Sequence, residues 1–123
     1  MSDVPPVKFD VTGEARYARL VRTASAALAA TESFSVDRTD DLRLLVDEVF
    51  NALLCAGAPR VVFEASPTGG ELRIVMRGVV AADEAAAAFA TVRRVAAVIA
   101  PGFGLVVAHG QAEFSATVTA HPA

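Results

Sequence analysis

The stretch from Asp40 to Ala56, DDLRLLVDEVFNALLCA, constrains the fold of this chain more than any other. At about 100° per residue, its core apolar residues fall within one narrow sector of an α-helix. Glu48 and Ala52 lie together on one flank of this apolar stripe, whereas Asn51 lies nearly opposite it. The pattern predicts a helix packed along one side, with Glu48 at the edge of the core. The stripe consists of Leu42, Leu45, Val46, Val49, Leu53 and Ala56.

Start and stop signals place this helix between Ser35, a favourable N-cap residue, and Gly57. Two further stretches have helical periodicity, Glu14 to Ala30 and Asp83 to Ala100. The last of these ends at Pro101-Gly102, because proline cannot continue a helix. Three amphipathic helices are therefore expected.

Strand patterns fill the rest of the chain, and four of them form two hairpins. The strand ranges are Val7–Val11, Arg60–Ala65, Leu72–Met76, Phe103–Ala108 and Glu113–Ala120. The order β-α-α-β-β-α-β-β predicts an α+β two-layer sandwich. Its mixed, mostly antiparallel sheet would be covered on one face by the three helices. With no linker or repeat, residues 1–123 should form a single domain.

Composition excludes several classes of function. The net charge of −3 argues against a nucleic-acid-binding protein, which normally has a basic surface. The single cysteine, Cys55, excludes an internal disulfide and a cysteine-rich zinc site. The N-terminal MSDVPPVKF lacks the pattern of a signal peptide, and Pro101-Gly102 interrupts the longest apolar run. We therefore expect a cytoplasmic protein with no membrane contact.

The run DDLRLLVDEVFNALL resembles the N-box helix of the GHKL (histidine-kinase-like) ATPase fold, in the branch of RsbW-like and SpoIIAB-like anti-sigma factors. The stretch ARLVRTASAAL resembles the first helix of that branch, and the order of elements agrees. The resemblance is specific over residues 14–65 and only topological beyond them. It implies an anti-sigma factor that is also a serine kinase of an anti-sigma antagonist.

Carried over residue by residue, the resemblance implies a degenerate nucleotide site. Glu48 takes the position of the catalytic general base, but the magnesium-holding asparagine of the family falls on Ala52. The adenine-reading motif, an Asp followed by spaced glycines, is reduced to Gly78, and no phosphate lid fits before Glu84. The pocket formed by Glu48, Ala52 and Gly78 is therefore expected to bind no cofactor. ATP and Mg²⁺ would be required only if the kinase activity is retained.

The resemblance also implies protein partners, namely a sigma factor, an anti-sigma antagonist, or both. Arg22 matches the partner-gripping arginine of the family best, with Arg19 beside it. On residue pattern alone, these arginines could equally form a solvated helix face. Family members pair through this end of the domain, so a homodimer is expected. Two alternatives stay open: an active serine kinase with Glu48 as base, and a scaffold subunit without a regulatory partner.

The remaining candidate residues have simpler explanations. His109 and His121 lack neighbouring acidic residues, so a surface position is expected rather than a metal site. Cys55 is interpreted as a small core residue. Arg93 and Arg94 would extend to solvent, or contact an acidic partner. No serine, histidine and aspartate combination suggests nucleophilic catalysis.

Overall fold

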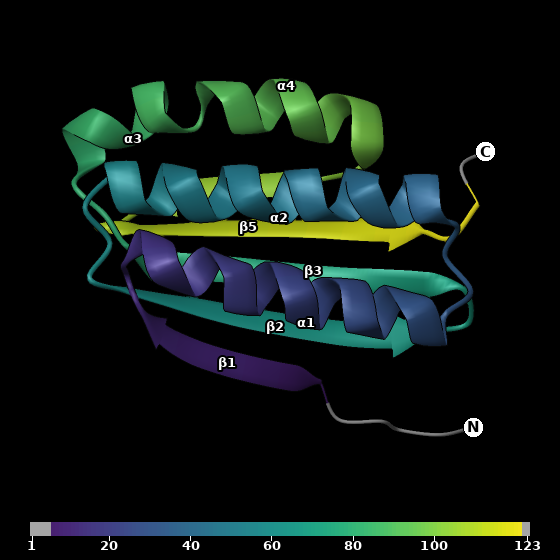
Figure 1. The fold of residues 1–123 in the computed structure, drawn as a ribbon. Helices are drawn as coiled ribbons and strands as arrows, with labels where there is room; N and C mark the ends of the chain where they lie inside the picture. Colours follow the sequence, from purple (N-terminus) through teal and green to yellow (C-terminus); the bar gives the residue numbers. More distant parts are fainter. Residues whose placement is uncertain (1–5, 122–123) are drawn as a thin grey trace.

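A five-stranded sheet forms one layer of the computed structural model, and helices form the other (Figure 1). The structure describes residues 6–121. The strands are β1 (Val7–Thr12), β2 (Arg60–Thr68), β3 (Glu71–Val79), β4 (Gly104–Ala108) and β5 (Gln111–Thr119). The helices are the short 3-10 turn η1 (Ala15–Tyr17), α1 (Ala18–Thr31), α2 (Val36–Cys55), α3 (Ala82–Ala88) and α4 (Ala90–Ile99).

The strand order is β1-β2-β3-β5-β4, and every neighbouring pair is antiparallel. The predicted two-layer α+β architecture is confirmed, and its sheet is more regular than the mixed sheet expected. Two-residue turns join both predicted hairpins, Gly69-Gly70 and His109-Gly110. All four turn residues have positive φ, which suits the twist of adjoining antiparallel strands.

Buried and exposed side chains alternate along the strands, so the sheet has one buried face and one open face. The buried face contacts the helices and carries the large core side chains of β2, β3 and β5. Phe9 of the edge strand β1 stacks on Phe63, with ring centroids 6.1 Å apart. The buried strand residues are Val61, Phe63, Ala65, Leu72, Ile74, Met76, Ala112, Phe114, Ala116 and Val118.

Helix α2 lies in the middle of the helical layer, with α1 on one side and α4 on the other (Figure 1). The hydroxyl of Ser35 accepts a hydrogen bond from the backbone N–H of Arg38 at 3.0 Å, which confirms the predicted N-cap. All six residues of the predicted α2 stripe are buried. No helix within residues 6–121 is long and apolar enough to cross a bilayer.

The third predicted helix is divided into α3 and α4. The division falls at Phe89, whose ψ of 2° departs from the helical value of about −42°. The Phe89 ring is buried in the core, so its packing holds the bend in place. The described chain therefore has four α-helices where three were expected.

Candidate functional site

The structure places Glu48 and Ala52 on α2 as the helical geometry predicts. Glu48 is half-buried, and its carboxylate makes no hydrogen bond or ion pair with any residue in the range 6–121. Ala52 is only 4% exposed, whereas Asn51 is exposed. The position to which the family resemblance assigns a metal-holding amide is therefore occupied by a methyl group packed in the core.

The connection between β3 and α3 leaves no room for a phosphate lid. Strand β3 ends at Val79 and α3 begins at Ala82, so only two residues separate them. The backbone N–H of Ala81 donates a hydrogen bond to the carbonyl of Ala56, 2.9 Å away, at the end of α2. This bond fixes the start of α3 directly against α2. The expected truncation of the lid is confirmed.

Gly78 is fixed by packing. A Cβ atom at this position would lie 2.9 Å from the carbonyl oxygen of Arg60 and 3.0 Å from the Cβ of Ala58. It would also approach Leu53 of α2 at 3.5 Å. Close approach of neighbouring backbone is one of the reasons a strand needs glycine. Gly78 thus lies near the C-terminal end of α2, beside Leu53 rather than Glu48.

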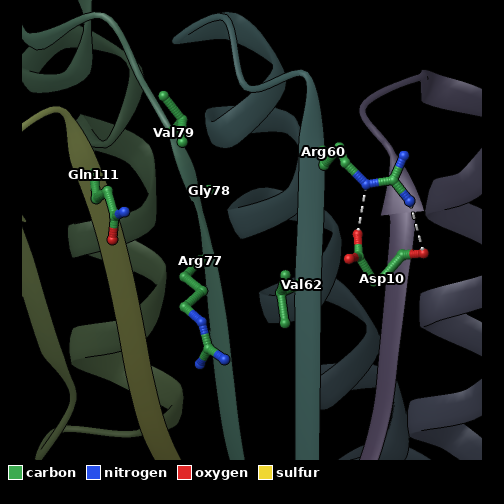
Figure 2. Close-up of a pocket in the computed structure, with 7 residues that line it drawn as sticks. All are labelled: Asp10, Arg60, Val62, Arg77, Gly78, Val79 and Gln111. Carbon is green, nitrogen blue, oxygen red and sulfur yellow. Dashed lines mark hydrogen bonds and ion pairs between the residues drawn. The ribbon is translucent and has the colours of Figure 1, made fainter.

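Of five pockets within residues 6–121, none is lined by Glu48 or Ala52, whereas Gly78, the third residue of the expected nucleotide pocket, lines one. One pocket, of about 200 Å³, lies on the open face of the sheet (Figure 2). It holds two guanidinium groups, on Arg60 and Arg77, that already have carboxylate partners. Nε of Arg60 donates to Asp10 at 2.8 Å, and Nη1 of Arg77 donates to Glu64 at 2.9 Å. Its residues are Asp10, Arg60, Val62, Arg77, Gly78, Val79 and Gln111.

The two candidate partner-binding arginines differ in their surroundings. Nη1 of Arg22 lies 3.0 and 2.9 Å from the two carboxylate oxygens of Asp47 on α2, so this charge is engaged within the chain. Arg19 is exposed, and it forms no ion pair with any residue in the described range. Of the two, Arg19 is the more available to a partner.

Arg38 is only 8% exposed, although its sequence pattern was not recognised as that of a buried residue. Its Nε donates to the carbonyl of Thr119 at 2.8 Å and its Nη2 to the carbonyl of Ile99 at 2.9 Å. A weaker contact of 3.4 Å joins Nη1 to Asp41. One signal was present, because position 38 lies four residues before Leu42 and therefore on the core stripe. The role of Arg38 is to join α2 to the ends of α4 and β5.

Cys55 is exposed, so its interpretation as a core residue is wrong. It is the last residue of α2, where its flank of the helix is open to solvent. His109 and His121 are exposed as expected. Within residues 6–121, no group of three or more His, Cys, Asp or Glu residues is arranged to hold a metal ion.

Together, the antiparallel sheet, the single helical layer and the central α2 define an α+β two-layer fold. The chain is similar in structure to the crystal structure of the RsbU and RsbW domains of Rv1364c from Mycobacterium tuberculosis, with a TM-score of 0.69 and 15% sequence identity. The match covers 94% of this chain and 32% of that one, so this chain spans about a third of its length. No protein-family model and no curated protein sequence matches. The likeness therefore shows that this chain shares its fold with part of that structure.

Proposed function

We propose that this chain is a regulatory binding module of the RsbW type, which binds a sigma factor, an anti-sigma antagonist, or both, and has lost ATP turnover. The observation that carries the proposal is the pair of residues Glu48 and Ala52 on α2, in a chain whose fold is similar to a structure that contains an RsbW domain. Glu48 is present, but a buried Ala52 stands in the place of the metal-holding amide. The protein-binding function of such a fold does not require that amide, whereas the kinase function does.

Loss of turnover follows from how phosphoryl transfer is catalysed. The reaction depends on positioning the phosphates and on neutralising their charge with metal ions and backbone amides. Here the connection from β3 to α3 has two residues, and its second residue is hydrogen-bonded to the end of α2. A general base such as Glu48 contributes little when nothing holds the phosphate beside it. In this proposal, the protein acts in the cytoplasm by binding its partner, without phosphorylating it.

Partner binding would begin at α1. Arg19 is free to form a charge-assisted hydrogen bond with an acidic side chain of the partner. Arg22 could do so only by exchanging Asp47 for the partner's carboxylate, which reduces its net contribution. The proposal therefore ranks Arg19 above Arg22 as the contact residue.

The test measures binding between this chain and purified sigma factors and anti-sigma antagonists encoded in the same genome, by titration calorimetry. We expect one such protein to bind, and Arg19→Glu to weaken the complex by about tenfold or more. Arg73→Glu is a matched control, because Arg73 is an exposed arginine on the open face of the sheet. Absence of binding to every sigma factor and antagonist would overturn the proposal.

The carboxylate of Glu48, which has no ion-pair or hydrogen-bond partner within residues 6–121, is the observation that favours the alternative of an active serine kinase. Calorimetry with ATP and Mg²⁺ separates the two functions. No heat of binding at millimolar nucleotide excludes the kinase, whereas saturable binding together with phosphorylation of an antagonist serine would establish it. Sedimentation of the isolated chain tests the expected homodimer in the same preparation.

A further inference from the structure

An apolar groove runs between α2 and α4 on the helical layer, well apart from the open face of the sheet. Its volume is about 320 Å³, and most of its lining is aliphatic. One wall belongs to α2 and the other to α4, which lie side by side in Figure 1. We call it the α2–α4 groove, and its residues are Asp41, Leu44, Arg94, Val95, Val98 and Ile99.

Two apolar side chains of the groove, Leu44 and Val98, cannot withdraw from water. Val98 is 81% exposed and Leu44 is 48% exposed. The side of α4 that faces the core is already occupied by Val92, Ala96 and Ile99, which are buried. Rotation of α4 to cover Val98 would therefore expose core residues. An exposed apolar feature of this kind, bordered by charges, marks a binding surface more often than an isolated surface residue does.

The α4 border of the groove carries the positive charge of Arg94, which is exposed and forms no ion pair with any residue in the range 6–121. Asp41, the acidic residue of the groove, lies on the α2 wall and is already paired with Arg38 at 3.4 Å. Nη2 of Arg94 donates a long hydrogen bond to the hydroxyl of Thr91, at 3.4 Å. Helix α4 itself contains no acidic residue. The charge on this border therefore complements an acidic side chain from outside the chain.

The helical walls of the groove favour a helix as the bound segment. Both walls are helices, whose backbone groups bond internally, so an extended peptide would find no strand edge to pair with. Side chains of a third helix can instead pack between the ridges of the two walls. A second copy of this chain fits less well, because a two-fold contact centred on α4 brings the arginines of both copies together.

We propose that the α2–α4 groove docks an amphipathic α-helix of the partner protein. Apolar side chains of that helix fill the space between Leu44 and Val98, and an acidic residue on its flank binds Arg94. This inference rests on the proposed function and assigns the surface that performs it. It adds a second contact area to the one expected at Arg19.

The test compares groove variants in the complex with the sigma factor or antagonist that binds. Leu44→Asp, Val98→Asp and Arg94→Glu should each weaken binding by about tenfold or more. Val36→Asp controls for the valine substitution, because Val36 is 78% exposed and lies in the first turn of α2, outside the groove. Arg73→Glu controls for charge reversal, and both controls should bind within about twofold of the wild type. Circular dichroism melts verify that every variant is folded.

The outcomes separate this inference from the proposed function. If the complex forms and its affinity is unchanged by all three groove substitutions, the groove proposal is overturned and the proposed function is left intact. If no sigma factor or antagonist binds, the proposed function fails, and a designed probe tests the groove alone. The probe is an amphipathic helical peptide of about 18 residues, with leucines on one face and glutamates beside them.

Methyl resonances of Leu44 and Val98 that shift on addition of the peptide, and do not shift in Arg94→Glu, support the groove. Unchanged resonances overturn it. A wild-type dimer that Val98→Asp converts to a monomer would show that a second copy occupies the groove, and would also overturn the inference.

Discussion

The guanidinium of Arg22 on α1 and the carboxylate of Asp47 on α2 form a close ion pair, with Nη1 3.0 and 2.9 Å from the two carboxylate oxygens. The pair crosses the boundary between two helices of the same layer, and both side chains are half-buried. Resemblance to the family assigns Arg22 to a partner, whereas the structure gives it an internal acceptor. A partner that uses Arg22 must therefore displace Asp47.

The strength of this pair is measured by a double-mutant cycle with Arg22→Ala and Asp47→Ala. Because both groups remain in contact with water, we expect a coupling energy of about 0.5–1 kcal/mol from urea unfolding. The same cycle on Arg43 and Asp40, an exposed pair 3.2 Å apart within α2, should give less. A coupling energy near zero for Arg22 and Asp47 would mean that Arg22 is free for a partner after all.

Arg38 should contribute more to stability than any other arginine. Arg38→Met removes hydrogen bonds to the carbonyl of Ile99, in a buried region, and to the carbonyl of Thr119, in a part-buried one. We expect the free energy of unfolding to fall by about 2–4 kcal/mol, because each bond involves a charged donor. Arg43→Met, at an exposed position of the same helix, should change it by less than about 0.5 kcal/mol. Equal effects of the two substitutions would contradict the proposal that Arg38 joins α2 to the ends of α4 and β5.

The apolar stripe of α2 could be predicted from the sequence, whereas the hydrogen bonds of Arg38 on the same helix could not. The α2 stripe repeats within a few residues, so periodicity alone places Glu48 and Ala52 correctly. The partners of Arg38 are 61 and 81 residues away in the chain, and Arg22 and Asp47 are 25 apart. No local pattern encodes such pairings. Cys55 was misplaced for a similar reason, since only the packed layer determines which flank of a helix end is covered.

Ala52→Asn tests whether space for a nucleotide remains beside Glu48 on α2. The substitution introduces the amide that the family resemblance implies at a position only 4% exposed, which lines none of the five pockets described above. We expect the free energy of unfolding to fall by about 1–3 kcal/mol, because the amide loses its water without gaining a partner. The exposed neighbour provides the control, and Asn51→Ala should be close to neutral. If Ala52→Asn were neutral and raised the affinity for ATP, a functional pocket would have to remain beside Glu48.

Gly78→Ala separates packing from nucleotide binding as the reason for glycine at the end of β3. The added methyl group would meet the carbonyl oxygen of Arg60 at 2.9 Å, and backbone cannot move aside as a flexible side chain can. We expect a loss of about 1–3 kcal/mol in the free energy of unfolding, measured by urea titration. Gly102→Ala is the control, since no atom lies within 4 Å of a Cβ there and its φ is not positive. That change should be neutral or stabilise the protein by about 0.4–1 kcal/mol. A Gly78→Ala variant as stable as the wild type would remove the packing explanation and return Gly78 to the list of ligand-binding candidates.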